Sequence, residues 1–370
     1  MSGLYVHVPF CQRVCVYCDF AVTTARKWFQ RYTSAVLREI DLSVPAPSPS
    51  RTVYLGGGTP SYLPLDCLKR IITAAVGDLT ITGELTLEAN PNQVRPEQAE
   101  AWRRMGINRL SMGVQSFNEK ELKFLTRNHT AEQAIRCVED ARTAGFDNLS
   151  IDLIFGLPGQ TSEDWQKNIE RAIEMAPDHL SVYNLTYEPG TPLHKWSLEG
   201  KLSERDDDTE KTMFLLAHNM LEERGFEHYE ISNYAKPGFK SRHNSAYWSG
   251  DSYIGVGPSA HSFDGAKRWW NVKSIEMYMN LIEKQERATN ELEMLTKEQQ
   301  VIEFLMLGLR QAGGVSKTRF LSRFGEDFET RYEKILSLYE TFFVVRPDSV
   351  GLTPEGWFLY DHLCRELISS

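Results

Sequence analysis

Short apolar runs alternate with longer amphipathic stretches over the first half of this chain. Six of these runs have the length and residue types of strands, and the stretches between them repeat apolar positions every three or four residues. The predicted strands are residues 4–8, 52–55, 85–89, 109–114, 149–154 and 180–185, and the predicted helices are 31–42, 65–75, 96–105, 131–144 and 162–175. This alternation predicts a parallel sheet with crossover helices, either an open doubly wound sheet or an incomplete barrel.

The pattern changes in the second half of the chain. A long charged helix is predicted over residues 206–224, followed by aromatic, Gly-rich loops over 226–271 that we interpret as covering a site. Further helices are predicted over residues 297–310, 317–324, 328–339 and 354–369, with a short β-like pair around Phe343 and Gly351. We therefore predict three parts: a core barrel (1–235), a connecting and site-covering segment (236–290) and a small helical domain with a two-stranded wing (291–370).

Polar and glycine residues gather where the predicted strands end. Gly56, Gly57, Gly58 and Thr59 follow the second strand, Glu88 lies on the third, and Gln115 follows the fourth. The carboxyl ends of parallel strands carry the ligand sites of both open sheets and barrels. A glycine run there offers backbone that a ligand can approach, although a tight turn explains it equally well. Glu88 is suited to accept hydrogen bonds from ribose hydroxyls, or it is a solvated surface acid.

Charge and composition narrow the function classes. The 370 residues carry a net charge of −9, which argues against a large nucleic-acid surface. A hydrophobic fraction of 41% is sufficient for a sizeable core. The sequence has neither an apolar run of about 18 residues nor the layout of a signal peptide at its start. We therefore expect a cytoplasmic protein with at most peripheral membrane contact.

Three of the six cysteines lie close together in the sequence. Cys11, Cys15 and Cys18 follow the first predicted strand, whereas the other three are far apart and are interpreted as buried apolar side chains. A structural zinc site needs four ligands, so zinc would require a remote fourth ligand. Three thiolates can instead hold a cuboid iron–sulfur cluster and leave one iron open to a substrate.

The spacing C-x3-C-x2-C, with an aromatic residue before the last cysteine, resembles that of the radical S-adenosylmethionine (SAM) enzymes. The resemblance implies a 4Fe-4S cluster on Cys11, Cys15 and Cys18. It also implies that the open iron chelates the amino and carboxylate groups of SAM, which an electron from the cluster cleaves to methionine and a 5′-deoxyadenosyl radical.

Five further segments resemble one branch of that family, which contains the oxygen-independent coproporphyrinogen III oxidases (HemN) and their haem-chaperone paralogues. These segments are residues 4–11, 55–60, 109–117, 151–161 and 255–260. The resemblance implies a partial (β/α)6 TIM-like barrel with a small C-terminal helical or winged-helix-like domain. It also implies a SAM pocket made of Tyr5, Tyr17, Gly57, Gly58, Thr59, Glu88, Gln115, Arg127, Asp152, Thr186 and His261.

Two departures separate the chain from the oxidases of this branch. Phe20 stands where the oxidases have a fourth cysteine, and the chain begins only ten residues before Cys11. The chaperone paralogues carry the signature H-N-x-x-Y-W, which is present at residues 243–248. The resemblance therefore implies a haem chaperone that passes haem to respiratory haem proteins, and it leaves a homodimer open. The alternative is a radical oxidase or dehydrogenase that acts on a porphyrinogen.

Haem binding is expected near the H-N-x-x-Y-W segment. His243 is the first candidate for an axial ligand because imidazole is a common haem ligand, and His261 is the alternative. Tyr247 and Trp248 offer flat apolar rings against which a macrocycle can pack.

Overall fold

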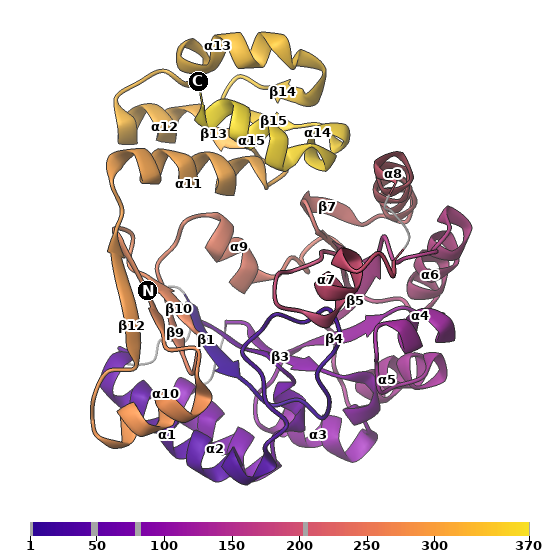
Figure 1. Cartoon of the computed structure of the whole chain (residues 1–370), viewed down its shortest axis with the longest axis vertical. Helices are drawn as coiled ribbons and strands as arrows, with labels where there is room; N and C mark the ends of the chain where they lie inside the picture. Colours follow the sequence, from indigo (N-terminus) through magenta and orange to yellow (C-terminus); the bar gives the residue numbers. More distant parts are fainter. Residues whose placement is uncertain (1–2, 46–50, 78–82, 203–205, 370) are drawn as a thin grey trace.

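The computed structural model describes residues 3–45, 51–77, 83–202 and 206–369, and it has a parallel sheet at its centre (Figure 1). Six strands pair side by side in the order of the sequence, all parallel. They are β1 (Gly3–Val8), β2 (Thr52–Gly57), β3 (Leu85–Ala89), β4 (Arg109–Gln115), β5 (Leu149–Phe155) and β6 (His179–Asn184). The predicted parallel sheet with crossover helices is therefore confirmed. In the described residues the sheet does not close on itself, and its crossover helices lie on one side of it, as in an incomplete barrel and unlike a doubly wound sheet.

Helices connect successive strands and lie on the outer side of the sheet in Figure 1, opposite to α9 and the C-terminal elements. The crossover helices are α1 (Phe29–Ser43), α2 (Leu65–Val76), α3 (Pro96–Arg104), α5 (Ala131–Thr143) and α6 (Ser162–Glu174), followed after β6 by α8 (Asp207–Glu223). Sequence reasoning missed the short helices α4 (Glu119–Phe124) and α7 (Pro192–Leu198). Capping boxes at Thr130 and Thr161 fix the starts of α5 and α6. No helix in the described ranges is long and apolar enough to cross a bilayer.

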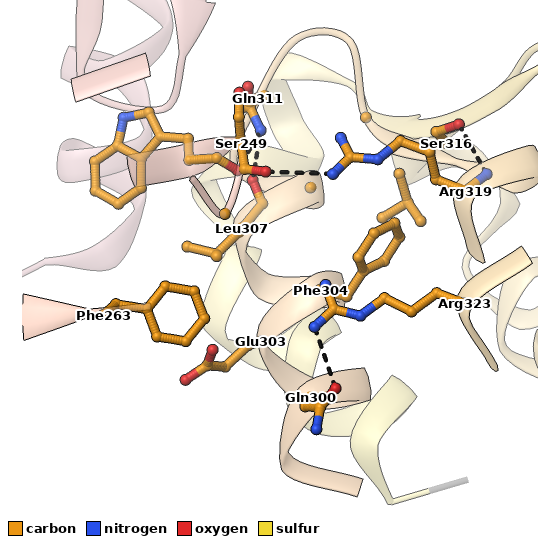
Figure 2. Close-up of a pocket in the computed structure, with 15 residues that line it drawn as sticks. Ser249, Phe263, Gln300, Glu303, Phe304, Leu307, Gln311, Ser316, Arg319 and Arg323 are labelled. Atoms are coloured by element: carbon orange, nitrogen blue, oxygen red, sulfur yellow. Dashed lines mark hydrogen bonds between the residues drawn. The ribbon is translucent and has the colours of Figure 1, made fainter. Parts of the chain in front are cut away.

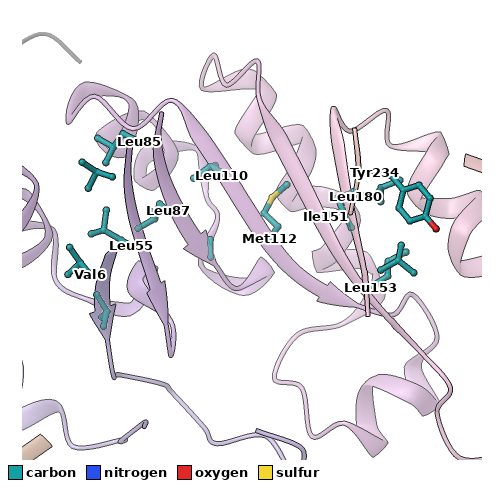
Figure 3. Packing of buried hydrophobic residues seen from close by; sticks show 14 of the residues in the cluster. Val6, Leu55, Leu85, Leu87, Leu110, Met112, Ile151, Leu153, Leu180 and Tyr234 are labelled. Atoms are coloured by element: carbon teal, nitrogen blue, oxygen red, sulfur yellow. The ribbon is translucent and has the colours of Figure 1, made fainter. Parts of the chain in front are cut away.

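The core lies between the sheet and these helices (Figure 3). Leu55, Leu87, Leu110 and Ile151 come from four neighbouring strands, and each is fully buried. Strands covered by crossover helices read as nearly continuous apolar runs, which is why the sequence located them well.

The segment 226–271 differs from the prediction of loops. It contains β7 (Glu227–Glu230), β8 (Asn233–Ala235), α9 (Arg242–Trp248), β9 (Tyr253–Val256), β10 (His261–Phe263) and β11 (Lys267–Asn271). β8 and β7 extend the sheet beyond β6, whereas β9 pairs parallel to β1 and continues through β10 and β11 to β12 (Thr289–Met294). α10 (Ile275–Glu283) lies between β11 and β12. These strands are too short to show an alternation of apolar and polar residues in the sequence. The segment is held to the sheet because β9 pairs with β1 and β8 pairs with β6, both distant in sequence.

The C-terminal part is helical with a small antiparallel sheet, as predicted. Its elements are α11 (Lys297–Leu309), β13 (Val315–Ser316), α12 (Lys317–Phe324), α13 (Phe328–Leu338), β14 (Phe343–Val345), β15 (Ser349–Leu352), α14 (Pro354–Phe358) and α15 (Tyr360–Ile368). The predicted two-stranded wing gains a third strand, because β13 pairs with β15. The predicted last helix is divided at Leu359. The described residues also contain four 3₁₀ turns: Arg26–Trp28, Pro60–Tyr62, Pro91–Gln93 and Glu340–Phe342.

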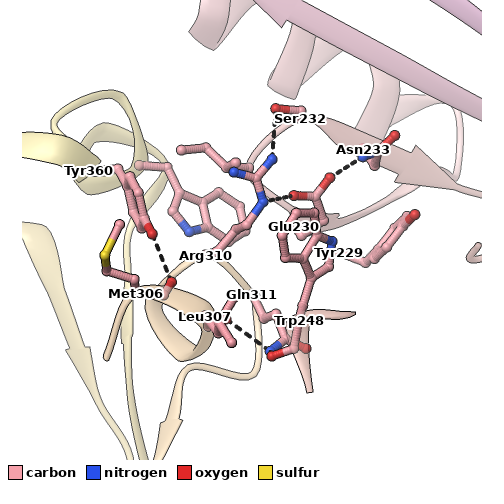
Figure 4. A network of polar contacts seen from close by, with 12 residues as sticks. Tyr229, Glu230, Ser232, Asn233, Trp248, Met306, Leu307, Arg310, Gln311 and Tyr360 are labelled. Carbon is pink, nitrogen blue, oxygen red and sulfur yellow. Dashed lines mark hydrogen bonds and ion pairs between the residues drawn. The ribbon is translucent and has the colours of Figure 1, made fainter. Parts of the chain in front are cut away.

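A buried ion pair joins the C-terminal part to the sheet (Figure 4). The Nε of Arg310, at the end of α11, lies 2.7 Å from Oε2 of Glu230 on β7, and the Glu230 side chain has no exposed surface. The guanidinium of Arg310 also stacks over the Trp248 ring, 4.3 Å from its centroid. The neighbouring Gln311 donates its side-chain amide to the Trp248 carbonyl at 2.8 Å.

Replacing Arg310 by Ala is expected to lower the free energy of unfolding by about 3–5 kcal/mol, because a buried carboxylate would lose its cation. The control Arg331→Ala removes a partly exposed pair with Glu326 and should cost no more than about 1 kcal/mol. Denaturant unfolding of the two variants beside the wild type measures both values. Equal effects would contradict the role assigned to the buried pair.

Candidate cofactor site

The loop that carries the three cysteines is tied to the rest of the fold by backbone hydrogen bonds. The N–H of Cys11 donates to the Thr23 carbonyl at 3.0 Å, which closes the loop on itself. The N–H of Val16 donates to the Thr126 hydroxyl at 3.2 Å, and the Val16 carbonyl accepts from Leu193 N–H at 3.0 Å. The loop between Cys11 and Cys18 is therefore bonded to the connection between β4 and α5, and to α7.

The glycine run after β2 lies directly against this loop. A Cβ added at Gly58 would lie 3.0 Å from the Cys11 sulfur and 2.9 Å from the Phe10 carbonyl oxygen, so only glycine permits the approach. The next residue, Thr59, donates its hydroxyl to the Cys11 sulfur at 3.6 Å. Gly57 has a φ of 110°, which side chains rarely adopt. The run is thus a close backbone approach as well as a turn.

Arg127 places a positive charge beside the cysteines. Its Nη1 lies 3.6 Å from the Cys15 sulfur and 3.4 Å from the Tyr17 hydroxyl. Its Nη2 donates to the Gly113 carbonyl at 2.6 Å and to the Asn90 side-chain oxygen at 2.5 Å. The guanidinium thus lies beside a sulfur that would bind iron, where it can offset the negative charge of a cluster.

Glu88 is held at the end of β3 by two donors. It accepts the Tyr54 hydroxyl at 2.8 Å and the Gly57 N–H at 3.0 Å. Burial, with the nearby charge of Asp152 adding to it, raises the pKa of Glu88 to about 7. Asp152 accepts the Ser111 hydroxyl at 3.2 Å, and burial raises its pKa as well. Of the two interpretations of Glu88 left open by the sequence, the solvated surface acid is therefore wrong.

Gln115 occupies a strained position at the end of β4. Its φ is 70°, and the pairing of β4 with β5 shifts between Gly113 and Gln115. Its side-chain oxygen is buried and has no hydrogen-bond partner among the described residues, and the same is true of the Arg127 Nε. Strained residues with unsatisfied polar atoms gather at ligand sites, so both atoms are available to a bound cofactor.

The donor set fits a cluster better than a single metal ion. All three thiols are free, and burial raises the pKa of the Cys11 thiol to about 11. In the described part of the chain no three His, Cys, Asp or Glu side chains are placed to hold one ion, which gives zinc no support. Each cysteine of a cuboid cluster binds a different iron, so the three sulfurs need not converge on one point.

The other residues of the predicted SAM pocket have fewer contacts with the cysteine loop and with Glu88. The Tyr5 hydroxyl lies 3.2 Å from His7 Nδ1, and its ring centroid is 6.2 Å from that of Tyr54, beside Glu88. Thr186 is exposed beyond the end of β6, and His261 is exposed at the start of β10. No described contact joins either of these two to the cysteine loop, so their roles stay predictions.

His243 is placed as a structural residue. Its side chain is 1% exposed, and its two ring nitrogens lie 2.8 Å from the Thr52 hydroxyl and 2.8 Å from the Tyr247 hydroxyl. The ring stacks on Tyr54 at 5.1 Å, and burial lowers its pKa to about 3. In this conformation neither nitrogen is free for iron, which argues against His243 as an axial ligand. His261, the alternative, has an exposed ring that stacks on Trp270 at 5.4 Å.

Three important residues escaped sequence reasoning. Glu84 accepts hydrogen bonds from the backbone N–H groups of Arg242 and His243, at 2.9 and 3.1 Å, and so fixes the start of α9. Tyr54 bonds to Glu88, and Asn90 bonds to Arg127. All three lie on or beside predicted strands, and this position was the one sign of a role in the sequence. Their hydrogen-bond partners could not be predicted because they are distant in sequence.

Comparisons with known proteins agree with this geometry. The chain matches the Radical SAM superfamily over residues 5–172 and the HemN C-terminal domain over 295–359. It is 34% identical to the heme chaperone HemW of Bacillus subtilis, covering 97% of both chains, and 36% identical to that of Lactococcus lactis, covering 91% and 89%. The structure of coproporphyrinogen III oxidase (HemN) from Escherichia coli superposes with a TM-score of 0.83 over 99% of this chain and 90% of that one. At 23% identity this likeness concerns the fold alone.

Replacing Cys11, Cys15 or Cys18 by Ala is expected to abolish the brown chromophore of the anaerobically reconstituted protein, because each thiolate would hold one iron. Wild type should bind close to four irons and four sulfides. The controls Cys67→Ala, Cys137→Ala and Cys364→Ala should keep the chromophore. Iron and sulfide analysis decides, and a full cluster in the Cys15→Ala protein would refute the assignment.

SAM affinity is expected to fall as the pH is lowered through the pKa of Glu88, about 7, because the ionised carboxylate is the better acceptor for ribose hydroxyls. If only the ionised form binds, the loss between pH 8 and pH 6 is about tenfold. The amino group of SAM titrates in the same direction, so Glu88→Gln is the control. Calorimetry should find weaker binding and a shallower pH dependence in that variant, and an unchanged slope would contradict the role of Glu88.

Proposed function

Since the chain belongs to the HemW family of radical SAM proteins, we propose that it is a haem chaperone that carries a 4Fe-4S cluster and SAM and passes haem to respiratory haem proteins. The observation that carries this proposal is the similarity to proteins named heme chaperones over nearly the whole length of both chains. The intact H-N-x-x-Y-W segment supports it.

Different residues of the proposed site would bind the cluster and SAM. Cys11, Cys15 and Cys18 would hold three irons of the cluster, and Arg127 would offset the negative charge of the thiolates. Glu88 would hold the ribose of SAM. When bound, the cluster supplies the electron for reductive cleavage of SAM.

The aromatic side chain of Tyr54 connects the H-N-x-x-Y-W helix with this pocket. Tyr54 donates its hydroxyl to Glu88 and stacks its ring on His243, the second residue of α9. A ligand that moves Glu88 would therefore act on α9 through Tyr54. This contact supports a role of the cofactor in setting the haem-binding or haem-transfer state.

The proposed axial ligand is His261. All nine histidines lie within the described residues, and His261 is the one in the exposed class. Burial and the nearby charge of Arg268 lower its pKa, which keeps the imidazole neutral and able to bind iron at pH 7. His243 would instead hold α9 in place for haem contact by Tyr247 and Trp248.

Titration of the anaerobically purified protein with haem, with and without its cluster, tests this proposal. His261→Ala is expected to change the Soret spectrum and to weaken haem binding about tenfold or more, because it removes the ligand to iron. His243→Ala should lower stability but keep the spectrum of the coordinated form. The reverse pattern in folded variants would assign the ligand to His243.

Incubation with reductant, SAM and coproporphyrinogen III separates the chaperone from the oxidase alternative. No conversion is expected. Formation of protoporphyrinogen at a catalytic rate would overturn the proposed function.

A further inference from the structure

A pocket opens where the end of α9 meets the C-terminal domain (Figure 2). Ser249 and Gly250 bound it on the side of α9, and Phe263 of β10 bounds it on the side of the sheet. The opposite wall comes from α11 and α12, through residues that include Phe304 and Arg319. The pocket therefore lies between the connecting segment (236–290) and the C-terminal domain.

Aromatic and apolar side chains form one part of the lining of this pocket, beside polar residues such as Ser249 and Gln300. Trp248, Phe263, Phe304 and Leu307 line it together, and the Trp248 indole N–H is buried without a hydrogen-bond partner among the described residues. The free space is about 70 Å³, several times the ~10–15 Å³ that one water molecule needs. It is sufficient for a short acidic side arm of a ligand, whereas a whole macrocycle would have to lie outside.

Two exposed arginines of α12 border the pocket. Arg319 reaches the Ser249 carbonyl at 3.3 Å, and Arg323 reaches the side-chain oxygen of Gln300 at 3.2 Å. Both partners are neutral, and within the described ranges neither arginine forms an ion pair with a carboxylate. Glu303, the acid in the lining, is already paired with Arg268 at 2.6 Å. The pocket therefore offers two uncompensated positive charges over aromatic walls, in a chain whose net charge is −9.

The strand β10 connects this pocket with the exposed histidine. His261 and Phe263 are two residues apart on β10, so their side chains lie on the same face, roughly 6.6 Å apart along the strand. Opposite them on β11 stand Trp270 and Arg268, whose guanidinium lies 5.7 Å from the Phe263 ring. A planar apolar ligand bound at His261 would thus extend over these aromatic rings towards Arg319 and Arg323.

We propose that this pocket binds the carboxylates of an amphipathic planar ligand, namely the propionates of haem, with Arg319 and Arg323 as the cationic partners. The inference rests on the proposed haem-binding function and adds where the acidic edge of the macrocycle is held. Guanidinium groups suit carboxylates because their planar fork can donate two parallel hydrogen bonds. The C-terminal domain then supplies half of the haem site, and haem bridges the two parts of the chain.

The test compares haem with haem dimethyl ester, in which both carboxylates are blocked, on the full-length protein reconstituted with its cluster. Wild type is expected to bind haem at least about tenfold more tightly than the ester, because charge-assisted hydrogen bonds are lost with the ester. The Arg319→Gln/Arg323→Gln double variant should bind both compounds equally, with the affinity that wild type has for the ester. The control Arg331→Gln changes an exposed arginine of α13 outside the lining and should behave as wild type.

Metal-free protoporphyrin IX separates the carboxylate pocket from the iron ligand. His261→Ala should leave its affinity unchanged, whereas the double arginine variant should weaken it about tenfold or more. Wild type that binds haem and ester equally, or a double variant that keeps the preference for haem, would overturn the pocket while leaving haem binding intact. Wild type that binds none of the three compounds would overturn the proposed function itself. Circular dichroism of each variant verifies that it is folded.

Discussion

The parallel pairing of β1 with β2, and of β2 with β3, is the constraint on which the site depends. In such a ladder the carboxyl ends of neighbouring strands lie at one edge, so the loops that follow them must share the same space. The cysteine loop follows β1, the glycine run follows β2, and Glu88 ends β3. Contact between the first two requires bare backbone, because a Cβ at Gly58 would meet the sulfur of Cys11. The glycines are thus a consequence of the sheet geometry as much as of the cofactor.

A second set of contacts fixes the position of α9 on the sheet. Glu84 satisfies backbone N–H groups at the start of this short helix, and His243 reaches from it to the Thr52 hydroxyl on β2. The other end of α9 is held by the C-terminal domain, through Arg310 over the Trp248 ring. The H-N-x-x-Y-W segment therefore lies between the two parts of the molecule, and its first and last residues contact different parts. This arrangement explains the signature in physical terms. The histidine attaches α9 to the sheet, and the tryptophan contacts the C-terminal domain.

The division of roles among histidines follows from burial. His243 lies among aromatic rings with both nitrogens hydrogen-bonded, and the cost of desolvating a charged ring keeps it neutral. His261 lies on β10, in the antiparallel extension of the sheet, where its ring remains exposed against Trp270. An imidazole that is neutral and accessible is the form that binds iron. The same face of β10 leads to the arginine-bordered pocket, so the extension of the sheet and the C-terminal domain together form a surface that neither part has alone.

The sequence by itself determined the parallel core, the cysteine cluster and the family. Covered strands give continuous apolar runs, and ligands in one loop keep their spacing whatever the rest of the chain does. It failed over residues 226–271, since strands as short as β8 and β10 show no readable alternation, and the segment joins the sheet only where β9 pairs with distant β1 and β8 pairs with β6. It also left open whether Glu88 was buried and which histidine was exposed. Only the tertiary structure decided those points, because burial and the identity of a hydrogen-bond partner depend on residues far away in the chain. Tyr54 bonds to Glu88, and Thr52 to His243, for no reason that local sequence contains.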